Sequence, residues 1–449
     1  MRTETDELGT RELPDDALYG LQTLRARENF ALGGEAMPLD IVRAMAQIKL
    51  AAARAHLAVG VERREVFQAI SNACEQVIAG ACGDAFFTPA LQGGAGTSAH
   101  MNVNEVIANL ALQSLGKPCG RYDIVHPLDD VNRGQSTNDV FPTAIRIAAI
   151  LRLRDCSEAF ARLQNSLQQK ENAFGDIQKC GRTEWMDAVP ITLGSAFGAF
   201  AQAVGRDRWR LYKMEERLRQ INLGGTAVGN GDNASRLFRH RVVEELRRIA
   251  DIGLAAAEYP MDITQNADVF AEASGLLKAA AVNWMKICGD LRRMQSGPHA
   301  GLGEITLAPL QKGSTIMPGK YNPVIPEMAM QIAMQVIAND TAITLAASNG
   351  EFELNAFMPL IAARLLQSLR LMTNGAELLR EKCVDSIEAN PARCAALLEE
   401  STAFATRYTP ALGYDTVARL VQTHATDASA LAQDLRQALA AKTAENEAR

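Results

Sequence analysis

The sequence lacks the features that mark membrane, secreted and redox proteins. It has no uninterrupted apolar run of the roughly 18 residues that a membrane-spanning helix needs. Its first residues are polar and acidic, without the apolar segment of a signal peptide. Its 8 cysteines never form a C-x-x-C pair. We therefore expect reduced, mostly buried thiols in a cytoplasmic protein that has no metal or redox cofactor.

The charge balance excludes two further classes of partner. The 449 residues include 46 Lys and Arg and 52 Asp and Glu, for a net charge of −6, and the two signs are interspersed along the chain. Neither nucleic acid nor an anionic membrane surface is an expected partner for such a chain. Hydrophobic residues make up 47% of the chain, which is enough for a sizeable core in two or three domains.

Alanine and leucine at helical spacing dominate the rest of the chain. Long helices are predicted near 40–59, 140–174, 185–220, 264–295, 324–348 and 355–381. Clusters of Gly and Pro predict loops near 116–127, 222–233, 296–323 and 408–413. These patterns predict an all-α protein whose long helices pack as a bundle. Their excess of apolar surface indicates burial against a partner subunit.

The loop from Gly313 to Pro323 combines a hydroxyl, an ammonium and an amide. Ser314 lies six residues before Lys320, and Asn322 follows two residues later. A serine oxygen acts as a base only if its anion is stabilised, and a nearby ammonium provides this. The Gly and Pro residues are typical of an active-site lid. The loop therefore predicts a proton-abstraction site, with an ordinary surface turn as the alternative.

Four blocks of the sequence resemble the aspartase/fumarase superfamily. The loop resembles its G-S-S-x-M-P-x-K-x-N-P signature, which Glu327 completes. Three further blocks match the family in order and lie at 93–105, 126–139 and 181–190. The N-terminal run from Asp6 to Phe30 is similar to the aspartase branch in particular. The resemblance covers the chain from about residue 2 to residue 390.

The resemblance implies a fold, an assembly and a reaction. It implies an N-terminal domain over 1–138, a central long-helix bundle domain over 139–392 and a small C-terminal helical domain over 393–449. The subunits would form a homotetramer with a helical core, and each active site would take residues from three subunits. The implied reaction is the elimination of ammonia from an amino acid, with L-aspartate giving fumarate as the first hypothesis. No cofactor is implied.

The resemblance also assigns roles to single residues. Ser314 is the implied base, and Lys320 assists it. The remaining candidates would bind the substrate: Thr97, Ser98, His100, Ser136, Thr137, Asn138, Thr183, Glu184, Thr315, Met317 and Asn322. Hydroxyl groups would hold the β-carboxylate of the substrate, and Lys320 and Asn322 would hold its α-carboxylate. Asn138 and Thr183 would contact the amino group. Helix capping and turn formation are the alternative roles for such Ser, Thr and Asn residues.

Several positions depart from the family pattern. Glu184 stands where fumarases have histidine and aspartases have histidine or glutamine, and His100 stands where asparagine is usual. Ala99, Leu128 and Thr315 are further departures. A carboxylate at position 184 attracts a cationic leaving group, which favours an amine-lyase over a fumarate hydratase.

Other functions therefore stay open beside an ordinary aspartase. One is a lyase for another cationic amine, such as an ergothioneine-type betaine that releases trimethylamine, because Trp185 lies next to Glu184. Another is a catalytically silent structural homologue, which the presence of Ser314 and Lys320 disfavours. The sequence does not decide the substrate, and it assigns no firm role to His126 or Glu327.

Overall fold

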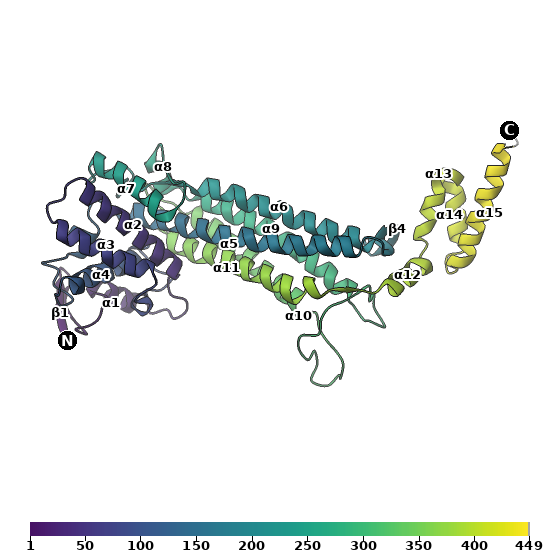
Figure 1. Cartoon of the computed structure of the whole chain (residues 1–449), viewed down its shortest axis with the longest axis horizontal. Coiled ribbons are helices and arrows are strands. Elements are labelled where there is room, and N and C mark those ends of the chain that lie inside the picture. The colour runs from purple at the N-terminus through teal and green to yellow at the C-terminus, as the bar shows by residue number, and fades with distance from the viewer. Residues whose placement is uncertain (448–449) are drawn as a thin grey trace. The chain divides into compact units, whose positions relative to one another are not determined.

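The computed structural model describes residues 1–447, which are mostly helical (Figure 1). The helices are α1 (Leu21–Asn29), α2 (Leu39–Ala58), α3 (Arg64–Ile78), α4 (Thr97–Ser114), α5 (Thr137–Ala173), α6 (Leu193–Leu218), α7 (Arg236–Ala250), α8 (Pro260–Gln265), α9 (Asp268–Met294), α10 (Val324–Ala347), α11 (Met358–Lys382), α12 (Pro391–Glu400), α13 (Thr409–Leu412), α14 (Tyr414–Thr423) and α15 (Ala428–Glu447). None of the described helices is long and apolar enough to cross a membrane.

The strands are short and form two-stranded sheets. They are β1 (Arg2–Asp6), β2 (Gly9–Leu13), β3 (Gln178–Thr183), β4 (Met186–Thr192), β5 (Gln220–Ile221), β6 (Ala255–Ala256), β7 (Ile305–Thr306) and β8 (Glu388–Ala389). Only β5 and β6 pair in parallel, and the other pairs are antiparallel. The prediction of an all-α protein is confirmed, since these sheets are additions to a helical chain.

Most of the predicted helices are present, with two local errors. The predicted helix at 185–220 is wrong over its first residues, because Met186–Thr192 is strand β4 and helix α6 begins at Leu193. Alternating β-branched residues in this strand favour extended backbone over helix. The predicted loop at 408–413 is wrong over most of its length, because helix α13 occupies Thr409–Leu412 and leaves Gly413 as the break.

The chain divides into two compact units. Unit 1 comprises Met1–Ser157, Trp209–Ala279 and Met334–Met372, and unit 2 comprises Glu158–Arg208, Ala280–Ala333 and the chain from Thr373 onward. The unit boundaries fall within the long helices, so each of them contributes one segment to each unit: α5, α6, α9, α10 and α11. The three-domain division expected from the sequence stays a prediction.

Unit 1 contains helices α1 to α4 and α7, and α2 packs against both α3 and α7. Helix α2 shows why the pattern works, because Ile41, Met45, Ile48 and Ala52 recur every three or four residues and are all buried. This stripe faces the core, and Val42 and Leu50 beside it are buried as well. Helices α4 and α5 begin in this unit, at Thr97 and Thr137.

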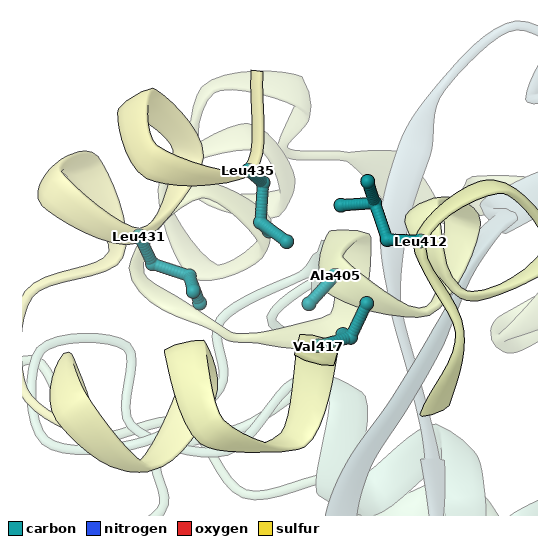
Figure 2. Packing of buried hydrophobic residues seen from close by; sticks show 5 residues of the cluster. All are labelled: Ala405, Leu412, Val417, Leu431 and Leu435. Carbon is teal, nitrogen blue, oxygen red and sulfur yellow. The ribbon is translucent and has the colours of Figure 1, made fainter. Parts of the chain in front are cut away.

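Unit 2 is built around the other ends of the long helices. Trp284 on α9 is fully buried and stacks on Phe160 of α5, with ring centroids 5.6 Å apart. Gly375 on α11 makes room for this indole, because a Cβ there would lie 3.0 Å from the Trp284 ring. The C-terminal helices of unit 2 enclose a small apolar core, which Figure 2 shows as inward-pointing side chains of Ala405, Leu412, Val417, Leu431 and Leu435.

Between α9 and α10, unit 2 contains the long loop that the Gly and Pro clusters predict (Figure 1). The predicted base, Ser314, lies on this loop.

Candidate active site

The Ser314 loop folds back on itself. The Gly313 backbone N–H donates to the Lys320 carbonyl oxygen at 2.9 Å, and the Asn322 side-chain amide donates to the Gly313 carbonyl oxygen at 2.9 Å. Gly313 is required here, because a Cβ would lie 2.5 Å from the Lys320 carbonyl oxygen. The loop is therefore a closed turn whose two ends are held together.

Within this turn, the Ser314 hydroxyl oxygen accepts two backbone hydrogen bonds. The Ile316 N–H donates at 3.2 Å and the Met317 N–H at 2.9 Å. Both donors would strengthen if the oxygen carried a negative charge, because charge-assisted hydrogen bonds are stronger than neutral ones. The turn thus stabilises an alkoxide at Ser314 without any rearrangement of the backbone.

The other candidates on this loop are open to solvent in the single chain. Thr315, Met317 and Lys320 are exposed, and Lys320 forms no ion pair with any residue in the described range. An exposed, unpaired ammonium six residues from Ser314 is available to an anionic substrate. Ile316, between Thr315 and Met317, is 84% exposed.

Thr183 and Glu184 lie at the tip of the β3–β4 hairpin. Thr183 pairs with Met186, so that Glu184 and Trp185 form a two-residue turn. Both turn residues have positive φ, 53° for Glu184 and 71° for Trp185. Such turns favour Asn and Gly, and a bulky residue in this region costs about 1 to 3 kcal/mol. Glu184 is exposed at this tip, and backbone strain of this kind is common at functional sites.

A buried carboxylate anchors this hairpin. Glu304 is fully buried and lies 3.0 Å from the Lys179 ammonium and 2.7 Å from the Arg182 guanidinium. Both cations belong to strand β3, so they tie the hairpin to the segment just before β7, in the first half of the loop between α9 and α10. Glu304 is a site-supporting residue that the sequence analysis missed. Nothing in its local sequence distinguishes it from a surface glutamate.

A cavity of about 520 Å³ opens beside the hairpin. Its wall includes Glu184, Trp185, Lys286, Asp290 and Arg293. The Arg293 guanidinium already lies over the Trp185 ring, 4.9 Å from its centroid. The cavity therefore offers paired charges of both signs, and a cation occupies one face of the Trp185 ring.

The remaining candidates lie in unit 1, at the N-termini of two long helices. Thr97, Ser98 and His100 are in the first turn of α4, and Ser136, Thr137 and Asn138 surround the start of α5. Helix N-termini present unpaired backbone N–H groups and a positive dipole end, which suit the binding of carboxylates. The two helix starts are joined directly, because His100 Nδ1 lies 2.7 Å from Thr137 Oγ1.

Several of these side chains also stabilise the local backbone. The Thr97 hydroxyl donates to the Gly94 carbonyl oxygen at 2.7 Å, and the Ser136 hydroxyl oxygen accepts from the Asn138 N–H at 3.2 Å. The Asn138 amide donates to the Ala227 carbonyl oxygen at 2.7 Å. The turn and capping roles expected as alternatives are therefore present. Ser136 keeps its hydroxyl proton, whereas Thr97 donates its proton to Gly94, so the Thr97 oxygen can only accept a further hydrogen bond.

A buried polar group supports the start of α5. Asp139 accepts hydrogen bonds from the backbone N–H groups of Ser136, Gly224 and Thr226 at 2.9 to 3.0 Å. Burial raises the pKa of Asp139 to about 6 although these donors oppose the shift. Lys49, also fully buried, donates to Asn132 at 2.8 Å, and burial lowers its pKa to about 7. Neither role follows from the sequence, because Asp139 has no local signal of its contacts and Lys49 lies within an ordinary helical pattern.

Two undecided residues have local roles in the structure. The His126 ring nitrogen Nδ1 accepts from the backbone N–H groups of Leu128 and Asp129, so it caps the π-helical turn Pro127–Val131. This agrees with a loop-anchoring histidine. Glu327 pairs with Arg292 at 3.3 Å.

The candidate residues thus form two groups, one in each unit. In unit 2, no hydrogen bond or ion pair among the described residues joins the Ser314 loop to Thr183 or Glu184. Ser314, Thr315, Met317, Lys320 and Asn322 share one loop, while His100 and Thr137 are in direct contact. Among residues 1–447, no group of three or more His, Cys, Asp or Glu side chains lies close enough to hold a metal ion.

Comparisons with known proteins agree on one family. A family model described as a lyase matches residues 9–338. The aspartate ammonia-lyase of Pseudomonas aeruginosa is 45% identical over 427 residues, covering 94% of this chain and 90% of that protein. The aspartate ammonia-lyase of Bacillus subtilis is 42% identical over 421 residues, covering 94% and 89%.

Solved structures give the same result for the fold. The fumarate lyase:delta crystallin from Brucella melitensis, bound to cobalt, is 43% identical with a TM-score of 0.93, covering 98% of this chain and 99% of that one. A class II fumarase from Schistosoma mansoni is 31% identical with a TM-score of 0.93, covering 97% and 95%. Both neighbours are named for chemistry that involves fumarate.

Proposed function

The chain belongs to the aspartase/fumarase superfamily of lyases, and from this membership we propose that it converts L-aspartate to fumarate and ammonia. The observation that carries the proposal is the Ser314 hydroxyl, whose oxygen accepts two backbone N–H groups in a loop that also holds the unpaired Lys320 ammonium. This arrangement suits a base that removes a weakly acidic C–H proton.

The reaction follows from this base. The Ser314 alkoxide takes a proton from the substrate carbon next to the β-carboxylate, and the electron pair of that C–H bond moves into the carboxylate. The resulting dianion then re-forms its carboxylate, its electrons make the new C=C bond, and the C–N bond breaks to release ammonia. Because the intermediate carries an additional negative charge, the helix N-termini at Thr97 and Thr137 and the ammonium of Lys320 stabilise it more than the substrate.

We further propose that the protein is a homotetramer whose active sites combine residues from three subunits. Two features support this: the candidate residues fall in two groups, and large apolar side chains are exposed on the long helices. The exposed side chains include Trp209, Tyr212, Val282, Met334 and Leu345. Such surface is costly in water and is typical of an interface. Light scattering should give a tetramer, and a stable, active monomer of about the 48.5 kDa chain mass would refute this.

The roles of single residues are proposed on the same basis. Lys320 and Asn322 bind the α-carboxylate, and Asn138 with Thr183 contacts the amino group. Glu184 lies beside Thr183 on the hairpin tip, where its carboxylate attracts the leaving ammonium. A cytoplasmic location stays a prediction from the sequence.

The betaine alternative receives no support from the hairpin geometry. The Arg293 guanidinium already lies over one face of the Trp185 ring, 4.9 Å from its centroid, so a trimethylammonium group would have to bind the opposite face. Lys286 lines the same cavity and pairs with Asp290 at 2.6 Å, so the charges there are balanced and do not select a bulky cation. A small ammonium next to Glu184 does not need this space.

The proposal is tested by product analysis with the purified protein. Incubation with L-aspartate should yield fumarate, followed by its ultraviolet absorbance, and an equal amount of ammonia. Parallel reactions contain L-malate or a trimethylammonium betaine. Fumarate from malate alone would make the protein a hydratase, and release of trimethylamine without turnover of aspartate would establish the betaine alternative.

A further inference from the structure

We infer that His100 is a positioning residue, whose ring holds the Thr137 hydroxyl so that this hydroxyl donates its proton to a substrate carboxylate. The inference rests on the proposed function, because it takes Thr137 as a ligand of the substrate. It concerns a position at which this chain departs from the asparagine that is usual in its superfamily.

The geometry leaves His100 a single polar contact. The ring is 1% exposed, and its Nδ1 lies 2.7 Å from Thr137 Oγ1. The other ring nitrogen, Nε2, is buried and has no hydrogen-bond partner among the described residues. The contact with Thr137 therefore decides which nitrogen carries the proton.

The surroundings keep the ring neutral. The charged group that acts on the ring is Lys49, which is fully buried and interacts in turn with the buried Asp139. Asp139 is already bonded to three backbone N–H groups and makes no hydrogen bond to His100. Burial, with a smaller contribution from Lys49, lowers the pKa of His100 well below its usual 6.5. The imidazole thus has one N–H near neutral pH.

Two tautomers are compatible with this contact, and they differ at Thr137. With the proton on Nε2, the Thr137 hydroxyl must donate to Nδ1, and a buried N–H at Nε2 has no acceptor. With the proton on Nδ1, the ring donates to Thr137 Oγ1, and only an acceptor lone pair at Nε2 is unpaired. Unpaired buried N–H groups are rarer in proteins than under-satisfied acceptors. The tautomer protonated on Nδ1 is therefore favoured.

This tautomer has a consequence for substrate binding. A carboxylate only accepts hydrogen bonds, so Thr137 binds it only if its hydroxyl proton is free. A ring that donates from Nδ1 occupies a lone pair of Thr137 and leaves that proton available. Asparagine places its amide nitrogen near the position of Nδ1 and can donate in the same way, which explains how both residue types serve this position.

Substitutions at position 100 test the role through activity. H100N should keep most of kcat/KM, whereas H100Q and H100L, which lack a donor at the Nδ1 position, should lose about tenfold to hundredfold, the range for a hydrogen bond to a charged group. In a T137V background, H100L should cause no further loss, because its effect passes through the Thr137 hydroxyl. If H100L does not fold, H100N against H100Q gives the same comparison.

A matched control separates positioning from stability. His424 also has one hydrogen-bonded ring nitrogen, 2.8 Å from Asp434, and lies at the end of helix α14. H424L should lower the melting temperature and leave kcat/KM unchanged. Two results would overturn the inference. One is an equal loss of activity in H100N and H100L, and the other is a loss caused by H100L that is as large in the T137V background as in the unaltered protein.

Nitrogen-15 NMR of the histidine rings tests the tautomer without any substrate. The signals absent from the H100N spectrum identify the His100 ring, and we expect the proton on Nδ1. A proton on Nε2 would overturn the inference even if the protein is active. Failure of the proposed function appears separately, as no fumarate from L-aspartate with the unaltered protein.

Discussion

Replacing Glu304 by glutamine should destabilise the protein strongly, because this carboxylate is the buried anchor of the β3–β4 hairpin. Glu304 is fully buried, and its two partners are nearly so, with side-chain exposures of 8% for Lys179 and 17% for Arg182. Glutamine keeps the size of the side chain and removes its charge. Both cations would then be left in a poorly solvated position without a counter-ion.

The magnitude follows from the cost of an unpaired buried charge. Breaking a buried ion pair by removing one partner typically costs about 3 to 5 kcal/mol. Here one carboxylate serves two cations, and we expect a loss in this range, reduced only by the small remaining exposure of Arg182. The hairpin also carries Thr183 and Glu184, so kcat/KM should fall together with the stability.

Denaturant unfolding of Glu304→Gln and of the unaltered protein measures this loss. Glu381→Gln is the matched control, because Glu381 is 51% exposed and its pair with Arg380 should contribute less than about 1 kcal/mol. Adding Lys179→Met to Glu304→Gln removes one of the stranded cations and should recover part of the stability. An unfolding free energy of Glu304→Gln within about 1 kcal/mol of the original would refute the reasoning.

Three further predictions concern the site. Lys320→Met should lower kcat as well as raise KM, since Lys320 stabilises the intermediate; a rise in KM alone would restrict it to binding. Glu184→Gln should lower kcat/KM on L-aspartate by about tenfold through loss of a charge-assisted contact, and an unchanged rate would make Glu184 a bystander. The third concerns pH and His100. Because its folded pKa lies below 6.5, the folded state binds the proton less readily than the unfolded state, so stability is present above pH 6.5 and is lost as the pH falls below it. The unfolding free energy of H100N should fall less on acidification than that of the unaltered protein. Parallel curves of unfolding free energy against pH would contradict this.

The sequence predicts the long helices well, because their signal is local. Helix α2 was expected at 40–59 and spans Leu39–Ala58, and helix α10 was expected at 324–348 and spans Val324–Ala347. In both, apolar spacing of three and four residues decides the structure without help from distant contacts. The hairpin at 178–192 was missed, because its turn is Glu184–Trp185 and contains neither Gly nor Asn.

The candidate site shows a similar limit. The Ser314 loop was identified from its residue types, but the two N–H groups on its oxygen depend on backbone geometry. The contact of His100 with Thr137 joins residues 37 positions apart, and the anchoring of Arg182 by Glu304 joins residues 122 positions apart. Such pairs have no local pattern, and only the fold brings them together.

The rate of fumarate formation by Ser314→Ala tests the central claim most directly. Ser314 is partly exposed and its hydroxyl contacts only its own loop, so the substitution should leave the melting temperature nearly unchanged. We expect kcat with L-aspartate to fall about a hundredfold to ten-thousandfold, as for the loss of a general base. A folded Ser314→Ala protein that retains more than about a tenth of the original kcat would show that another group takes the proton.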